Sequence, residues 1–275
     1  MQGAAAADPD AVARGAYLAA AAGCDQCHTD TAHHGAPFAG GRVLDTPYGA
    51  IPTPNITPDK ATGIGAWSMA DFVRAMRWGI APDDTHYLPV FPFPFYARLS
   101  DGDLADLQAF LDSRAPVSRP DPAGPGSIAL IGRTRAAIAV ALTAPATPWR
   151  PDPHRDAVWN RGAYLVATVG RCGDCHTARD ALGRPEQDRR LGGGISRLSG
   201  KKAPNITPDH ATGIGDWSAA DIEHLLETGE TPDFDLVGGD MAEIVHNMRR
   251  LTEADRRAIV VYLKSVPAVS SPAKK

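Results

Sequence analysis

The sequence predicts an all-α protein of two tandem domains, which are connected by a proline-rich segment that contains one extra helix. Three observations support this prediction. The second half of the chain repeats the first, each half contains one short string with two cysteines, and the same helix-start patterns occur at matching places in both halves.

The repeat is clearest in the fourteen residues NITPDKATGIGAWS, which begin at Asn55 and return from Asn205 with two changes. The string RGAYL likewise occurs at 14–18 and again at 161–165. A chain of 275 residues is long enough for two small domains. The expected boundaries are 8–118 for the first domain, 119–155 for the connecting segment and 156–268 for the second domain.

Helices are expected in the same order in both domains. In the first domain, an alanine-rich helix over 8–22 leads to the cysteine string. The pattern Ser-x-x-Asp predicts helix starts at Ser68 and Ser100, and Ser218 and Thr252 begin the matching patterns in the second domain. The last helix of each domain has apolar residues at helical spacing: Leu104, Leu107, Phe110 and Leu111 in the first, and Ile259, Tyr262 and Leu263 in the second.

The remaining segments are less regular. Residues 29–67 and 177–217 are rich in glycine, proline and aspartate, which predicts loops. Within the connecting segment, the apolar stretch 128–144 contains Arg133 and Arg135, so it is a poor membrane span. We expect it to form a helix packed on one of the two domains, and the alternative is a helix that docks on a partner or a membrane surface.

All cysteines of the chain lie in the strings CDQCH at 24–28 and CGDCH at 172–176. Two cysteines three positions apart lie on the same side of one helical turn, so both sulfurs can reach the two vinyl groups of one porphyrin. The histidine that follows lies under the iron. This is the attachment signature of a covalently bound c-type haem. A zinc site or a redox dithiol also uses Cys-x-x-Cys pairs, but neither requires the next residue to be histidine both times.

The composition excludes other classes of protein. A net charge of −4, mixed along the chain, argues against nucleic-acid binding, which needs a basic face. The 27 glycines and 24 prolines predict much irregular backbone, so a buried porphyrin would supply part of the apolar centre. Because covalent haem attachment takes place outside the cytoplasm, we expect a periplasmic protein, with a signal peptide or membrane anchor upstream of the printed chain.

The strings RGAYL, CxxCH, NITPD and TGIGxWS and a closing Leu-(Ser/Thr)-x-x-Asp helix occur in this order twice. This arrangement resembles the class I c-type cytochrome subunits of periplasmic dehydrogenases, from Asp8 to Val266. The resemblance implies an alcohol, aldehyde, sugar-acid or nicotinate dehydrogenase as electron donor, and an oxidase or another cytochrome of the respiratory chain as acceptor. It implies no nucleic acid as partner, and membrane anchoring only through a segment outside this chain.

The resemblance also implies roles for single residues. The first and last helices of each domain would cross closely at Gly15 and Gly162, against Phe110 and Tyr262. The implied thioether anchors are Cys24, Cys27, Cys172 and Cys175, and the implied proximal iron ligands are His28 and His176.

The sixth iron ligand in this family is usually a methionine in the loop before the last helix. In the second domain Met241 is the candidate, with Met248 as the fallback. The repeat places Phe91 opposite Met241, and phenylalanine cannot ligate iron. It also places His86 opposite Leu236, so His86 is the expected sixth ligand of the first haem. The alternatives are a vacant or water-bound iron, and a ligand that swings in from Met69, Met76 or Tyr87.

Other repeated residues are candidates for the haem pockets. We expect Trp67 and Trp217 to pack beside a haem edge rather than to have a specific redox role. Asn55 and Asn205, with Thr57 and Thr207, could bind haem propionates or fix the loop. The remaining histidines are expected on the surface: His33, His34, His154, His210, His224 and His246.

These observations predict a periplasmic dihaem cytochrome c in which the two haems form a short electron relay. The alternative is a haem enzyme, of the dihaem peroxidase or thiosulfate dehydrogenase type, with the first haem as the catalytic centre. The symmetry of the repeat favours the electron carrier.

Overall fold

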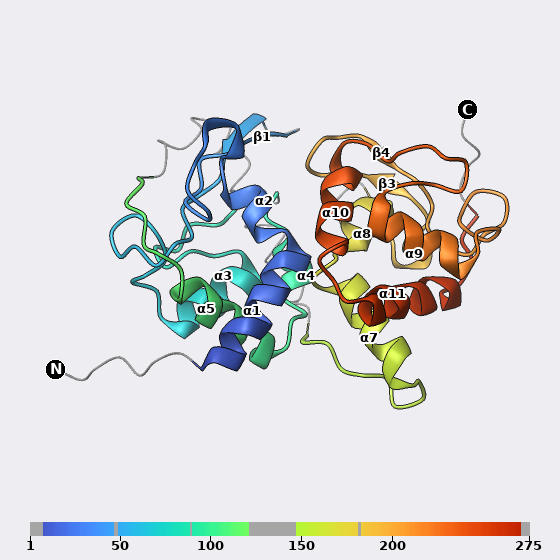
Figure 1. Ribbon diagram of the computed structural model, residues 1–275, viewed down its shortest axis with the longest axis horizontal. Helices are drawn as coiled ribbons and strands as arrows, with labels where there is room; N and C mark the ends of the chain where they lie inside the picture. Colours follow the sequence, from blue (N-terminus) through green and yellow to red (C-terminus); the bar gives the residue numbers. More distant parts are fainter. Residues whose placement is uncertain (1–7, 47–48, 89, 121–146, 181–182, 271–275) are drawn as a thin grey trace. The chain divides into compact units, whose positions relative to one another are not determined.

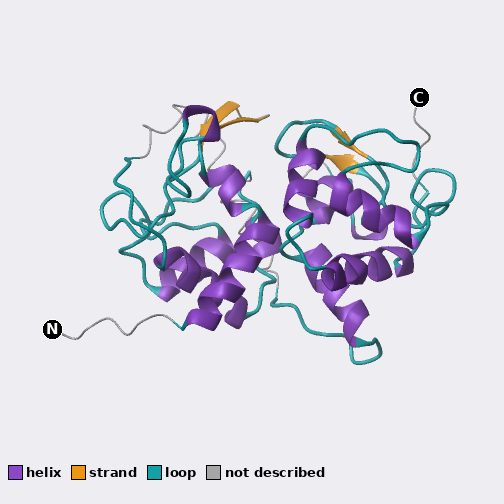
Figure 2. Ribbon diagram, in the orientation of Figure 1, coloured by secondary structure: helices purple, strands orange, loops and turns teal. Residues whose placement is uncertain are grey.

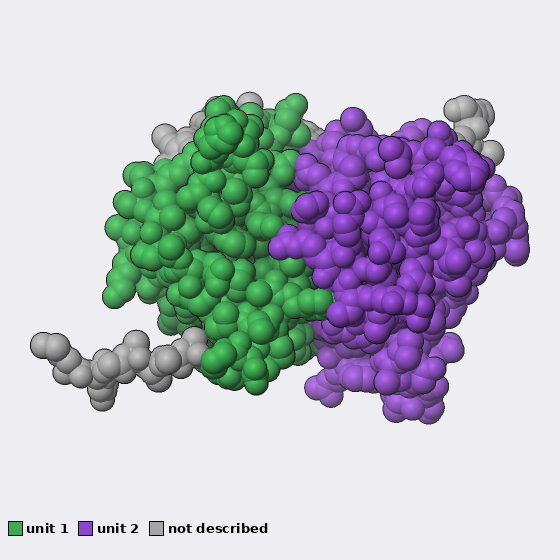
Figure 3. Space-filling view, viewed as in Figure 1, with its two compact units in different colours: residues 1–148 green, residues 149–275 purple. Residues whose placement is uncertain are grey.

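The structure is a computed structural model that describes residues 8–46, 49–88, 90–120, 147–180 and 183–270. It divides into two compact units, unit 1 at 1–148 and unit 2 at 149–275 (Figure 3). Each unit contains one of the two cysteine strings. The expected helix at 128–144 lies outside the described residues. Among the described helices, none is long and apolar enough to cross a membrane.

Both units follow the same plan, in which the first helix packs on the last helix and a short hairpin lies at one edge (Figures 1 and 2). Unit 1 contains α1 (Pro9–Ala22), α2 (Cys24–His28), the 3₁₀ turn η1 (Thr31–His33), β1 (Val43–Thr46), β2 (Gly49–Pro52), α3 (Met69–Trp78), α4 (Phe93–Tyr96) and α5 (Asp101–Asp112). Unit 2 contains α7 (Ala157–Ala167), α8 (Cys172–His176), η2 (Gln187–Arg189), β3 (Gly194–Ile195), β4 (Lys202–Ala203), α9 (Ala219–Thr228), α10 (Asp240–Met248) and α11 (Glu253–Ser265).

The predicted helix starts are confirmed, because polar side chains satisfy the first backbone N–H groups. Ser68 and Asp71 form a reciprocal capping box at α3, and Ser218 does the same with its aspartate at α9. At the last helices, Ser100 accepts a hydrogen bond from the third N–H of α5, and Thr252 does so at α11. Each start therefore follows from a pattern of four consecutive residues.

The close crossing of the first and last helices is also confirmed. A Cβ atom on Gly15 would lie 1.9 Å from the backbone oxygen of Asp106 in α5. On Gly162 it would lie 1.8 Å from the backbone oxygen of Ala258 in α11. Only a residue without a side chain permits this approach of the two backbones. In unit 1, Arg14 bonds both carboxylate oxygens of Asp106, at 2.6 and 2.9 Å, beside the crossing.

The prediction of loops over 29–67 and 177–217 is wrong at two short antiparallel hairpins. In unit 1, Val43 pairs with Pro52 and Thr46 pairs with Gly49, and in unit 2 Gly194 pairs with Ala203. Gly49, the first residue of β2, has a φ of 98°, which glycine adopts without strain. Hairpins of two to four residues per strand are too short to give an alternating apolar pattern, so composition alone suggested loops.

Candidate haem-binding sites

The two cysteine strings form short helices. In unit 1, Gly23 adopts a φ of 69°, ends α1 and starts α2, so Cys24 and Cys27 follow directly after a sharp change in chain direction. In unit 2, Arg171 occupies the position before Cys172 with a φ of 41°. One helical turn separates the cysteines of each pair, as the spacing predicts.

The histidine of each string bonds the carbonyl oxygen of a proline far along the chain. His28 Nδ1 lies 2.8 Å from the oxygen of Pro54, and His176 Nδ1 lies 2.7 Å from the oxygen of Pro204. This bond requires the proton on Nδ1, so the lone pair of the ring lies on Nε2, the atom that can bind a metal. The bond also fixes the plane of the ring. Burial lowers the pKa of His176, so its imidazole stays neutral, the form that binds iron.

The two cysteine thiols of unit 2 have raised pKa values. Burial raises the pKa of Cys172 to about 11, and burial also raises the pKa of Cys175. A zinc site uses thiolates, usually four ligands together. In the described part of the chain, no three histidine, cysteine, aspartate or glutamate side chains gather as a metal site would require. A pair of cysteines one helical turn apart, followed by an imidazole whose Nε2 can bind iron, fits a covalently attached haem.

Each histidine-binding proline is followed by an asparagine that fixes its loop. The Asn55 amide nitrogen donates to the carbonyl oxygen of Val117 at 2.8 Å, and that of Asn205 donates to the carbonyl oxygen of Val269 at 2.6 Å. Their side-chain oxygens accept the N–H of Thr57 and Thr207, both at 2.9 Å. The asparagines therefore tie the proline loop to the chain beyond the last helix. Of their two expected roles, the structure shows the fixing of the loop.

The prolines themselves were missed by the sequence reasoning. Pro54 and Pro204 each stand directly before a repeated NITPD string. Their repetition was a visible signal, but only the folded chain shows that their carbonyl groups meet His28 and His176.

Met241 lies in the first turn of α10, so the expectation that it belongs to a loop is wrong. Its side chain is half-buried. Met248, the fallback ligand, lies near the other end of the same helix with 2% of its surface exposed and belongs to the core of unit 2. The helix has 9 residues, whereas its counterpart α4 in unit 1 has 4.

The matching loop of unit 1 confirms the register of the repeat. His86 forms a bridge with Ile80, just as Leu236 does with Glu230 in unit 2. In this register Phe91, whose ring is half-buried, corresponds to Met241. Two aromatic rings contact it, since the centroid of the Tyr87 ring lies 5.5 Å away and that of the Tyr96 ring lies 5.7 Å away.

The imidazole of His86 is half-buried, and its Nδ1 has no hydrogen-bond partner among the described residues. The other candidates in unit 1 lie elsewhere, since Met69 and Met76 are on α3 and Met69 is 38% exposed. Leu236, the counterpart of His86, is 76% exposed, so the backbone does not by itself bury a side chain at this position.

Trp67 and Trp217 are half-buried in the turns before α3 and α9. In unit 2 the turn is tied to the last helix, because Lys264 Nζ donates to the carbonyl oxygens of Gly215 and Trp217, at 3.0 and 2.8 Å. Both tryptophans thus mark the end of the repeated loop and the start of a helix.

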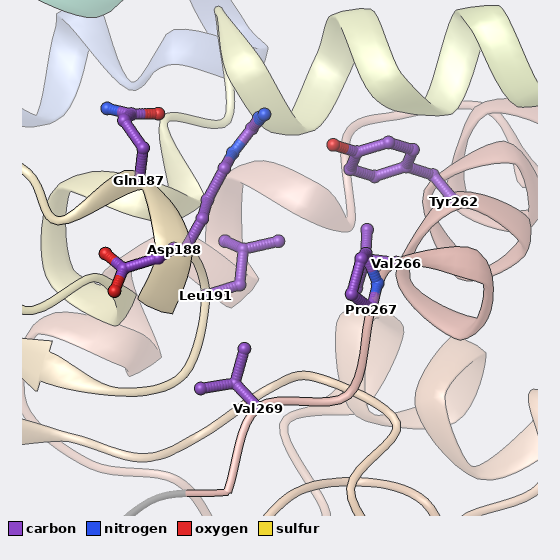
Figure 4. Close-up of a pocket in the computed structure, with 8 residues that line it drawn as sticks. Gln187, Asp188, Leu191, Tyr262, Val266, Pro267 and Val269 are labelled. Carbon is purple, nitrogen blue, oxygen red and sulfur yellow. The ribbon is translucent and has the colours of Figure 1, made fainter.

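A pocket of about 150 Å³ lies in unit 2, between the residues near η2 and the end of α11 (Figure 4). Leu191 and Tyr262 face it, and none of its lining residues belongs to the cysteine string. The matching rings in unit 1, Phe38 and Phe110, touch edge to face with centroids 5.6 Å apart. The pocket therefore lies where unit 2 has Leu191, which is smaller than the matching Phe38 of unit 1.

Comparisons with known proteins agree with these features. The family model described as cytochrome c matches residues 160–267. A diheme cytochrome c-type protein of Cereibacter sphaeroides is 40% identical, over 93% of this chain and 86% of that protein. The fructose dehydrogenase cytochrome subunit of Gluconobacter japonicus is 38% identical over 94% of this chain, but the match covers only 53% of that subunit. The gluconate 2-dehydrogenase cytochrome c subunit of Pantoea cypripedii is 38% identical over 94% of this chain, which spans 60% of that subunit.

Proposed function

Because this chain belongs to the family of dihaem c-type cytochromes, we propose that it carries single electrons from a periplasmic dehydrogenase to the respiratory chain. It is an electron-transfer cytochrome with two c-type haems: haem 1 is attached through Cys24 and Cys27, and haem 2 through Cys172 and Cys175. The dehydrogenase as donor is supported by the names of relatives that are cytochrome subunits of such enzymes.

The observation that carries the proposal is the pair of histidine–proline hydrogen bonds. His28 and His176 are the proposed proximal ligands, because each ring is fixed through Nδ1 and presents Nε2. A c-type haem supplies a reversible one-electron change at its iron. The protein holds the imidazole rigidly through that change, so few atoms need to rearrange when an electron arrives or leaves.

The proposed architecture is two tandem class I cytochrome c domains, at 8–118 and 156–268, joined by the segment 119–155. The matching helix pairs α1 with α5 and α7 with α11 support it (Figure 1). With one haem in each domain, the chain would form a short relay between its donor and an oxidase or another cytochrome.

The two haems differ in their proposed sixth ligands. Met241 is the proposed ligand of haem 2, and His86 is the proposed ligand of haem 1. His86 is proposed from the register of the repeat, because it lies in the unit whose methionine is replaced by Phe91. A neutral thioether favours ferrous iron more than an imidazole does, so haem 2 would have the higher reduction potential. Electrons would then pass from haem 1 to haem 2.

The variant His86→Ala tests this assignment. We expect haem 1 to become high-spin and to bind carbon monoxide, while the spectrum of haem 2 stays unchanged. The matched control is Leu236→Ala, which removes an exposed side chain at the same position of unit 2. A wild-type protein that already binds carbon monoxide would show a vacant or water-bound haem 1. A low-spin haem 1 in His86→Ala would show that another side chain is the ligand.

Phe91 favours a second candidate function, because it removes the methionine that would otherwise close the iron site of unit 1. In this alternative the protein is a haem enzyme of the dihaem peroxidase or thiosulfate dehydrogenase type, with haem 1 as the catalytic centre. Turnover of peroxide or thiosulfate by the purified protein would support it. Reduction by a periplasmic dehydrogenase without such turnover would support the electron carrier.

A further inference from the structure

We propose that Asp240 is a positioning residue that holds Met241 at haem 2 through the hydroxyl groups of Ser196 and Ser199. The inference rests on the proposed assignment of Met241 as the sixth ligand. It adds the residues that keep this methionine in place.

The contacts converge on one carboxylate oxygen. Asp240 Oδ2 accepts a hydrogen bond from Ser196 Oγ and another from Ser199 Oγ at 2.6 Å. Ser196 is 4% exposed, and its Oγ also accepts the backbone N–H of Leu198 at 3.1 Å. Hydrogen bonds to an ionised carboxylate are roughly twice as strong as neutral ones. The first residue of α10 is therefore anchored to a turn that is itself fixed.

This turn is part of the haem attachment region. Ser196 directly follows β3, which packs against α8. The Ser196 hydroxyl also lies within hydrogen-bond reach of the Cys175 sulfur. The Ser196 hydroxyl thus contacts both a thioether-forming residue and the residue before Met241. A single side chain connects the attachment side of the site with the proposed axial ligand.

The Asp240 carboxylate does not serve the usual purpose of an acid at a helix start. The residue before α10 is Gly239, with a φ of 58°, and no side chain caps this helix. Where the structure shows an aspartate at the start of α3 or α9, its carboxylate turns back to the same helix. The Asp240 carboxylate of α10 instead accepts hydrogen bonds from Ser199 and Ser196, which lie 41 and 44 positions earlier in the chain.

Unit 1 lacks both the ligand and the anchor. Phe91 replaces the methionine, and the residue before it is Val90. In the hairpin of unit 1, the apolar residues Val43 and Leu44 occupy the part of the strand that corresponds to Ser196 of unit 2. The two units share their caps, the histidine–proline bonds and the asparagine loops. Asp240 and Ser196 have counterparts of another type in unit 1, which also lacks the methionine. This difference indicates that the two residues serve the ligation by Met241 rather than the fold that both units share.

The test compares variants of the complete dihaem protein. Asp240→Val introduces the residue of unit 1, Ser199→Ala removes one donor, and Asp240→Asn retains an oxygen that can accept both bonds. The control is Asp233→Val, which removes the charge of an exposed aspartate from the preceding loop. The first readout is the weak far-red absorption band of the sulfur-to-iron bond. The second is the binding of free imidazole to the ferric protein. An imidazole titration of the wild-type protein gives the contribution of haem 1, which is subtracted from that of each variant.

We expect Asp240→Val to weaken the far-red band and to raise the affinity of haem 2 for imidazole about tenfold, which corresponds to about 1.4 kcal/mol. Ser199→Ala should give a smaller change in the same direction, and Asp240→Asn the smallest. If Asp240→Val fails to retain haem, Ser199→Ala decides the question. The proposal is overturned if Asp240→Val gives wild-type values of both readouts. If Asp240→Val does not retain haem, wild-type values in Ser199→Ala overturn it.

Met241→Ala separates this inference from the assignment that it rests on. Loss of the far-red band in Met241→Ala with no effect of Asp240→Val would overturn the positioning role alone. A band that persists in Met241→Ala would overturn the ligand assignment, and the positioning role with it.

Discussion

Single glycines set the distance between the first and last helices of each unit. A methyl group on Gly15 would overlap the backbone oxygen of Asp106, and it would also lie 2.7 Å from Cβ of Phe110. A backbone oxygen in a helix cannot turn aside as a flexible side chain can. The helices would have to separate, and the packing of α1 on α5 would loosen along their length.

We therefore predict that Gly15→Ala destabilises unit 1 by about 1–3 kcal/mol, the usual cost of overpacking. Denaturant unfolding of the haem-loaded protein measures this cost. The matched control is Gly102→Ala in the first turn of α5, where the added Cβ would lie 3.8 Å from the nearest atom, the Ser100 hydroxyl oxygen. The control should be neutral or slightly stabilising. Equal stability of Gly15→Ala and the wild type would contradict the close crossing.

The two units differ in how side chains fill the space beside the loop that follows each cysteine string. Leu191 and Phe38 follow the cysteine strings at matching positions, since each donates its N–H to the threonine hydroxyl after the histidine, at 3.1 Å. Both residues have a φ of 63°. The ring of Phe38 packs edge to face against Phe110 in unit 1. In unit 2, Leu191 lines the pocket of Figure 4 instead.

We predict that Leu191→Phe fills this pocket and stabilises unit 2 by roughly 0.5–2 kcal/mol, as cavity-filling changes often do. The backbone already accommodates phenylalanine in this conformation at position 38, so no strain is expected. The reciprocal variant, Phe38→Leu, should destabilise unit 1 by opening a matching void. Thermal unfolding of both variants checks the prediction, and a lower midpoint for Leu191→Phe would show that the pocket has another occupant.

At the scale of the whole molecule, the two attachment strings predict two haems that survive denaturation. Mass spectrometry of the denatured chain should show the mass of the polypeptide plus two haems. The double variant Cys24→Ser with Cys27→Ser should show one haem fewer, and its spectrum should retain the features of haem 2. A wild-type mass increase of one haem would contradict the two-site description.

The charge of the whole chain predicts weak electrostatic steering of its partners. A net charge of −4 with mixed signs produces only a modest field. Contacts between electron-transfer proteins are small and transient. Reduction by the dehydrogenase donor should therefore slow only a few-fold between low and physiological ionic strength, as stopped-flow measurements can show. A decrease by orders of magnitude would reveal a strongly charged docking patch.

The sequence by itself determined the features that depend on short spacing. The strings at 24–28 and 172–176 define haem attachment within one helical turn, and the Ser-x-x-Asp patterns define helix starts within four residues. The repeat added the register of the two units, including the replacement of Met241 by Phe91. These predictions hold because neighbours in the chain are also neighbours in a helix.

Only the tertiary structure decided which distant residues meet. The bonds from His28 to Pro54, from Asn55 to Val117 and from Ser196 to Asp240 each join segments at least 26 residues apart. Such contacts depend on how irregular loops close, and glycine- and proline-rich segments carry no periodic signal that specifies it. The short hairpins were missed for the same reason, and so was the placement of Met241 in the first turn of a helix.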